Sequence, residues 1–191
     1  FMMPAGGAFL AFSQKALKAT ETSTYPRCFL DLRDQMTANK DGYTPYTPAL
    51  PILYGLRKAL DMLLEEGLEN VYARHFRLAE GTRKAVAAWG LTICAQPGFE
   101  SDTVTAIIVP EDKDARTVIS TAFSKYNISL GAGLSELTGK AFRIGHVGDM
   151  NDVSMLGAIA GVEMALLDCD FDIKPGSGVA AAIEYYRATA K

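Results

Sequence analysis

Lys15 lies in the segment FSQKALKATE, residues 12–21, and its amine is the first group in the chain that could do covalent chemistry. A lysine amine forms Schiff bases with aldehydes once burial or neighbouring charges lower its pKa. The same segment also has the composition of an ordinary helix, because Ser13 is a good N-cap and residues 14–19 are helix formers. Local propensity therefore favours an exposed helical lysine, and its surroundings must decide between the two interpretations.

Arg143 is the second candidate, and it lies in the segment AFRIGH between Phe142 and Ile144. This segment predicts a strand, and strand alternation places Arg143 on the face opposite both neighbours. A guanidinium there either extends into solvent or forms a bidentate pair with a carboxylate. Spacing alone favours the solvent-facing alternative.

The hydroxyl-rich segment YTPYTP, residues 43–48, precedes a long predicted helix. Each proline fixes extended backbone before it, and hydroxyls held near a helix N-terminus can bind a phosphate. A rigid linker with capping threonines accounts for the segment equally well.

Other chemistry has weaker support. The glycine pairs at 131–133 and 176–178 lack the lysine of a phosphate-binding loop, so turns explain them more simply. His75 and His146 have no nucleophile motif near them and are expected to be structural. Cys28, Cys94 and Cys169 show no ligand spacing, so we expect neither a metal site nor a disulfide framework.

Composition narrows the class of protein. The 191 residues are 49% hydrophobic, enough for one globular domain or somewhat more, and the net charge of -3 comes from interleaved acids and bases. This distribution argues against a nucleic-acid partner. The chain has no apolar run long enough to span a membrane, and its unpaired cysteines are typical of a cytoplasmic protein.

The pattern of elements predicts two differently organised parts. Residues 8–12 have the length and composition of a strand, residues 22–48 are irregular around one short helix, and residues 49–66 and 69–89 form long helices. From residue 91 the order is strand, strand, helix, strand, strand, helix. This order predicts a compact α+β unit, with a small antiparallel sheet and two helices on one face.

Several ordered motifs together resemble the C-terminal half of the serine-glyoxylate and alanine-glyoxylate aminotransferases. These are class V pyridoxal-phosphate enzymes with the type I fold, which is α/β overall. The motifs are FMMPAGGAFLAFSQKAL, YTPYTPALPILYGLRKALDMLLEEGLENVYARH, SLGAGLSELTGKAFRIGHVGDMN, GVEMALLD and GSGVAAA. The resemblance implies that residues 1–48 end the large cofactor-binding domain, residues 49–90 are connecting helices, and residues 91–191 form the α+β small domain.

The resemblance also implies roles for individual residues. Arg143 matches the arginine that binds the substrate carboxylate, which reverses the preference for solvent. Thr47 matches a threonine that reaches the cofactor phosphate of the other subunit, assisted by Tyr46 or Tyr43, so a homodimer is expected. The Schiff-base lysine is expected just upstream of Phe1, which makes Lys15 an unrelated helical lysine.

The expected reaction is transfer of an amino group from serine or alanine to glyoxylate or a similar 2-oxo acid, with pyridoxal 5'-phosphate as cofactor. Two alternatives remain open. The first is another class V transaminase that prefers aspartate or alanine. The second is a non-catalytic fragment or binding domain that folds and dimerises without cofactor, because these residues do not include the family's reactive lysine.

Overall fold

The computed structural model describes residues 1–190 and divides the chain into two compact units, Phe1–Met62 and Leu63–Lys191. Within the described residues, none of the helices combines the length and apolar character that a membrane crossing requires. The domain limits at residues 48 and 90 that the family resemblance implies stay a prediction.

The first unit contains the helices α1 (Gln14–Thr22) and α2 (Leu32–Asn39) and most of α3 (Leu50–Glu66). Ser13 caps α1 by accepting a hydrogen bond from the Ala16 N–H at 3.2 Å, which confirms the helix start expected there. The strand predicted for residues 8–12 is wrong, because this segment has no regular structure. A strand needs a neighbour for its N–H and C=O groups, and residues 1–62 form no other strand.

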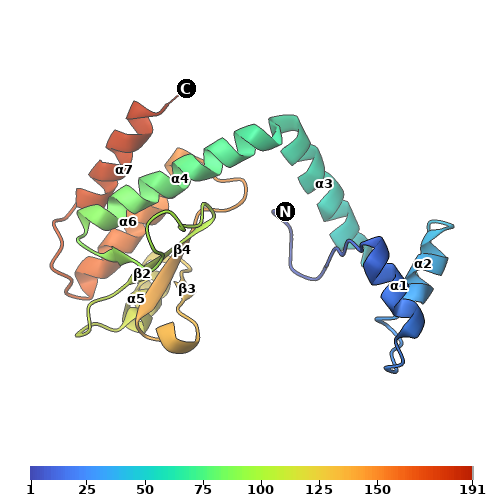
Figure 1. Ribbon diagram of the computed structural model, residues 1–191. Coiled ribbons are helices and arrows are strands. Elements are labelled where there is room, and N and C mark those ends of the chain that lie inside the picture. The colour runs from blue at the N-terminus through green and yellow to red at the C-terminus, as the bar shows by residue number, and fades with distance from the viewer. Residues whose placement is uncertain (191) are drawn as a thin grey trace. The chain divides into compact units, whose positions relative to one another are not determined.

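The second unit contains a four-stranded antiparallel sheet, as the sequence predicted (Figure 1). Its strands are β1 (Thr92–Ile93), β2 (Val104–Ile108), β3 (Gly131–Ala132) and β4 (Ala141–Gly145), in the spatial order β1-β2-β4-β3. A short 3-10 helix, η1 (Ser135–Leu137), lies between β3 and β4. The central position of β4 gives it hydrogen-bonded neighbours on both sides, which makes it a rigid support for a functional side chain.

Four helices complete this unit: α4 (Leu68–Ala88), α5 (Ala115–Tyr126), α6 (Asp152–Asp168) and α7 (Ser177–Ala188). Helices α4 and α5 contact the strands, and α7 packs against α4 and α6 (Figure 1). The sequence predicts the first three of these helices, and α7 is an additional helix. The core lies between these helices and one face of the sheet, and its largest fully buried side chains are Phe142, Leu78, Ile107, Ile144, Met155, Ile159 and Leu166.

The start of α7 is held by Glu163, a buried carboxylate on α6. Glu163 accepts hydrogen bonds from the Trp89 indole Nε1–H and the Gly178 N–H, both at 2.8 Å, and from the Gly176 N–H. Gly178 is required here because a Cβ on it would overlap the Trp89 indole. An internal carboxylate thus takes the donors that a phosphate would need, so the glycine pair at 176–178 is not a phosphate loop.

Candidate functional site

Arg143 lies in the middle of β4, on the face of the sheet opposite the core. Its neighbours Phe142 and Ile144 are buried among the helices, whereas Arg143 is half-buried. It is paired with Ala106 on β2 and with Gly131 on β3. The alternation predicted from the sequence is therefore confirmed.

The Arg143 side chain extends across Gly131. A Cβ added to Gly131 would lie 3.0 Å from Nε, 3.1 Å from Cβ and 3.4 Å from Cζ of Arg143. These distances are at or below ordinary van der Waals contact, so any larger residue at position 131 would displace the arginine. Gly145, the next residue of β4 on this face, is exposed, and a Cβ added to it would have no atom within 4 Å. The face beside Arg143 is therefore open to a small ligand.

The guanidinium of Arg143 has an unused donor. Its Nε atom is buried and has no hydrogen-bond partner among residues 1–190, and the ion pairs found in that range do not include Arg143. A buried donor without an acceptor costs about 1–3 kcal/mol, so this site favours a ligand that supplies one. A carboxylate matches the planar guanidinium with two parallel hydrogen bonds.

The segment 43–48 belongs to the first unit, and Arg143 belongs to the second. The Tyr46 hydroxyl lies 2.9 Å from the Cys28 Sγ atom, and the Tyr46 ring packs on Phe29 with 5.1 Å between centroids. The hydrogen bond with Cys28, together with partial burial, raises the pKa of the Tyr46 phenol. Tyr46 is therefore neutral, and its hydroxyl is already engaged inside this unit.

Thr47 is exposed, so its hydroxyl is accessible to a ligand. The start of α3 offers few other donors, because the N–H groups of Leu50, Ile52 and Leu53 are bonded to nearby carbonyls. Pro51 has no N–H to offer. The exposed hydroxyls of Thr47 and Tyr43 are therefore donors that this stretch can present to a ligand.

Lys15 is exposed in the first turn of α1, after the Ser13 cap. Nothing in its environment distinguishes it from a surface lysine, as local propensity indicated. Groups of three or more metal-ligating side chains are also absent from residues 1–190. The three cysteines are free thiols.

His146 is a fully buried structural residue, in agreement with the expectation from the sequence. Its Nδ1 atom lies 2.9 Å from the carbonyl oxygen of Asp102, and its Nε2 atom lies 2.9 Å from the Thr105 hydroxyl. Because a carbonyl can only accept, Nδ1 carries the hydrogen and the Thr105 hydroxyl donates to Nε2. Burial lowers the pKa of His146 to about 4, so the ring is neutral.

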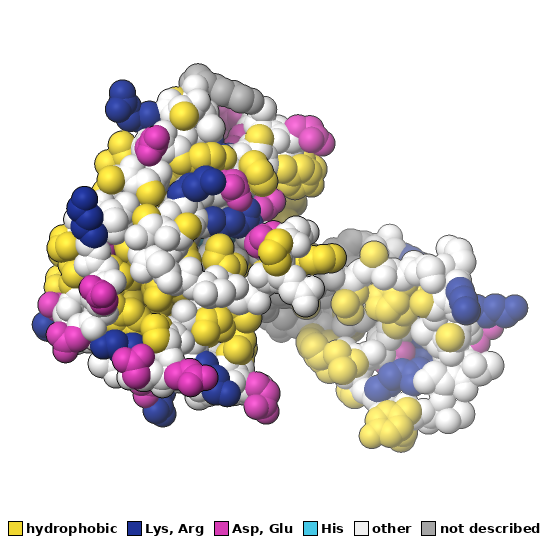
Figure 2. All heavy atoms as spheres, turned by 60° about the vertical axis from the view of Figure 1, so that its left-hand side comes forward, with side chains coloured by type: hydrophobic (Ala, Val, Ile, Leu, Met, Phe, Trp, Pro, Cys, Tyr) yellow, Lys and Arg dark blue, Asp and Glu magenta, His cyan; other side chains and the backbone are white. Residues whose placement is uncertain are grey.

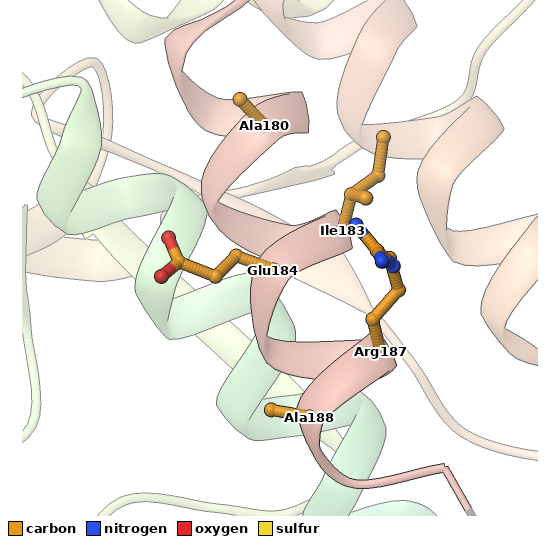
Figure 3. Close-up of a pocket in the computed structure, with 5 residues that line it drawn as sticks. All are labelled: Ala180, Ile183, Glu184, Arg187 and Ala188. Atoms are coloured by element: carbon orange, nitrogen blue, oxygen red, sulfur yellow. The ribbon is translucent and has the colours of Figure 1, made fainter.

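Two hollows are lined by residues other than Arg143, Tyr46 and Thr47. The first unit has a hollow of about 1270 Å³ lined largely by apolar side chains, among them Phe9, Leu10, Phe12, Phe29 and Leu30. Figure 3 shows the second hollow, whose lining residues all come from α7. In the view of Figure 2, basic and acidic side chains are interspersed over the larger unit and do not form a basic stripe.

Sequence relatives decide the family. The chain is 57% identical to the serine–glyoxylate aminotransferase of Methylorubrum extorquens over 97% of its own length and 48% of that protein. The chain belongs to the class V aminotransferases. It spans about half the length of the curated relatives it matches. No family model matches it.

Two further class V aminotransferases extend this similarity. The chain is 49% identical to the L-aspartate–glyoxylate aminotransferase of Paracoccus denitrificans, over 99% of this chain and 48% of that one. The solved pyridoxamine-pyruvate aminotransferase of Mesorhizobium loti shares 31% identity and a TM-score of 0.85, over 93% of this chain and 47% of that one. This solved structure has the type I aminotransferase fold, which confirms the expected α/β class.

Two acidic residues help to organise this region without a local signal in the sequence. Glu66 forms a bidentate pair with Arg74 at 2.7 and 2.8 Å. The contacts of Glu163 join α6 to the distant segments at Trp89 and Gly176, and no periodic pattern in the sequence indicates such a pairing.

Proposed function

We propose that this chain is the C-terminal part of an aminotransferase that moves an amino group from a small amino acid to glyoxylate. The observation that carries the proposal is the unpartnered Nε donor of Arg143, which lies beside an open face of the sheet. Glyoxylate and every α-amino acid share a carboxylate, and the arginine would orient either substrate through it.

Pyridoxal phosphate fits the groups that the chain presents. The Thr47 hydroxyl would donate a hydrogen bond to the cofactor phosphate, and Tyr46, anchored through Cys28, would fix the loop that carries Thr47. The bound cofactor would supply an electron sink for reactions at the amino acid's α-carbon. From the family resemblance, the lysine that binds it would lie upstream of Phe1 in the intact polypeptide.

Arg143 would do two things in this reaction. Its guanidinium would hold the carboxylate in one orientation, and so present the α-carbon of the amino donor in a fixed position. The same fork would accept glyoxylate after the first product leaves, because both substrates carry the group it recognises. The hydrogen-bonded neighbours of β4 on both sides keep this fork in place.

The apolar hollow of the first unit supports the same proposal. Phe9, Leu10 and Phe29 are 55%, 76% and 63% exposed, an unusual state for large apolar side chains that lie together. The relatives are about twice as long as this chain. We propose that the other half of the polypeptide covers this surface and pairs with residues 8–12.

The active unit would be a homodimer in which Thr47 of one subunit serves the cofactor of the other. This arrangement comes from the family resemblance, and so does the role of Tyr46 or Tyr43. The cytoplasmic location expected from the cysteines also stays a prediction. Serine is the proposed donor, because the relative at 57% identity is named for serine. Aspartate is the second candidate, because the Paracoccus denitrificans relative is named for aspartate.

The test is an amino-transfer assay on the intact polypeptide supplied with pyridoxal phosphate. Glyoxylate would be offered with serine, aspartate or alanine, and glycine would be measured together with the 2-oxo acid formed from the donor. The proposal expects equimolar glycine and 2-oxo acid with serine or aspartate. Cofactor binding without glycine formation from any of the three donors would contradict it.

A further inference from the structure

The turn that follows β4 forms hydrogen bonds with Arg74 and His75, two consecutive residues of α4. The N–H of Gly148 donates to the Nε2 atom of His75 at 3.1 Å, and the carbonyl of Gly148 accepts from the Nη1 atom of Arg74 at 2.8 Å. Arg74 also donates to the Met150 carbonyl at 3.0 Å, and Glu66 holds its guanidinium. Both polar groups of the Gly148 backbone are thus fixed by one helix.

The hydrogen bonds of His75 permit only one protonation state of its ring. The Nδ1 atom lies 2.7 Å from the carbonyl oxygen of Val71, which can only accept, so Nδ1 must carry a hydrogen. The backbone N–H of Gly148 can only donate, so Nε2 must carry none. The imidazolium form has a hydrogen on both nitrogens, and it cannot accept the Gly148 bond.

This turn is continuous with the strand that carries Arg143. Strand β4 ends at Gly145, His146 is anchored by its ring, and Gly148 follows with a φ of 97°, a conformation that glycine adopts without strain. The exposed Gly145 lies between the arginine and these two anchors. Gly148 therefore follows Arg143 in one continuous segment, with the open face at Gly145 and the anchored ring of His146 between them.

We propose that His75 is a positioning residue for Arg143: its neutral ring holds the turn after β4 through Gly148, and protonation of the ring releases that turn. The proposal rests on the carboxylate-binding role proposed above for Arg143. The titratable and charged groups around His75 are Glu66 at the end of α3, Arg74 on α4, and His146 on the connection from β4 to α6; Asp149, on the same connection, lies near Arg74.

The experiment uses hydrogen exchange and kinetics on the intact enzyme. Exchange of the peptide spanning residues 146–151, corrected for its intrinsic pH dependence, would be measured at about pH 8 and about pH 5.5, which bracket the range where imidazoles titrate. His75→Gln keeps an acceptor near the Nε2 position and does not titrate. His75→Leu removes the acceptor, and Tyr72→Leu changes an exposed residue of the same helix as a control.

We expect wild-type exchange in this turn to rise at the lower pH, His75→Gln to stay slow at both, and His75→Leu to be fast at both. The ratio of wild-type to His75→Gln kcat/KM for glyoxylate should fall by about 2- to 10-fold between pH 8 and pH 5.5, the range expected from one neutral hydrogen bond. Tyr72→Leu should behave like wild type in both measurements.

Equal exchange in wild type, His75→Gln and His75→Leu at both pH values would overturn the grip on Gly148, whether or not the enzyme transaminates. A turn that loosens without any change in the kcat/KM ratio would overturn the positioning role. A loosened turn in an enzyme that never uses glyoxylate would overturn the proposed function and the link to Arg143 together, and would leave only the structural grip.

Discussion

The Arg143 side chain lies across Gly131 of the neighbouring strand, with its Nε atom 3.0 Å from the place where a Cβ on that glycine would be. The two residues are direct partners in the β3–β4 ladder. An arginine that lies along the sheet in this way presents its guanidinium over the strands. Because position 131 has no side chain, the Arg143 guanidinium can lie close to the sheet in the orientation proposed for carboxylate binding.

Gly131→Ala in the intact enzyme should keep the fold and weaken carboxylate binding. The backbone at this position does not need a positive φ, so alanine is allowed, but the new methyl group would push Arg143 off its rotamer. We expect kcat/KM for glyoxylate to fall by about 2- to 10-fold, the factor that a strained rotamer supports. Gly157→Ala on α6 meets no atom within 4 Å, so it is the matched control and should leave kcat/KM unchanged.

Thr47→Ala should weaken cofactor binding, because the threonine hydroxyl is the proposed donor to the phosphate. The loss of one charge-assisted hydrogen bond predicts about 1.5–3 kcal/mol in the binding free energy. Equilibrium titration with pyridoxal phosphate measures the dissociation constant directly. Thr47→Ser keeps the hydroxyl and should bind as wild type does. A dissociation constant in Thr47→Ala equal to that of wild type would remove Thr47 from the site.

Glu163→Ala should destabilise the second unit strongly, because it leaves the Trp89 and Gly178 donors buried without an acceptor. The expected loss is about 3 kcal/mol in the free energy of unfolding, measured by urea denaturation of the intact protein. Glu184→Gln changes an exposed carboxylate on α7 (Figure 3) and should alter stability by less than about 0.5 kcal/mol. Similar stabilities for the two variants would show that Glu163 does not hold α7.

His146 makes the stability of the second unit depend on pH. Burial lowers its pKa from 6.5 to about 4, so between these values the unfolded chain binds a proton that the folded chain does not. The contribution of the neutral His146 to the free energy of unfolding is therefore fully present above about pH 6.5. It is lost as the pH drops towards 4, by up to about 3 kcal/mol. Urea unfolding at pH 7 and pH 4.5 measures this loss. His146→Gln should lose less stability over this interval than wild type, and an equal loss in both would contradict the assignment.

The sequence predicts most of the second unit because its signals are local. The apolar spacing in α4 and the alternation around Arg143 each fix an element or a face without reference to distant residues. The helix starting at Ser13 has the same kind of support. These features were therefore predicted and are found in the structure.

Features that depend on distant partners were missed or predicted wrongly. Residues 8–12 have the composition of a strand, but they find no strand to pair with inside their own unit. The start of α7 depends on Glu163, and the turn at Gly148 depends on Arg74 and His75. Each contact joins segments that are far apart in the chain, and residue spacing carries no information about such pairs.

The most direct test of the central claim is the Arg143→Lys substitution in the intact enzyme. A lysine keeps the positive charge but cannot form the two-pronged pair with a carboxylate. We expect the fold and the absorbance of the bound cofactor to be preserved. The loss of transition-state stabilisation should be about 2–5 kcal/mol, so kcat/KM for both serine and glyoxylate should fall roughly 30-fold to several thousand-fold. Amines without a carboxylate should be little affected. Turnover of serine and glyoxylate at wild-type rates in Arg143→Lys would contradict the account and return Arg143 to a solvent-facing role.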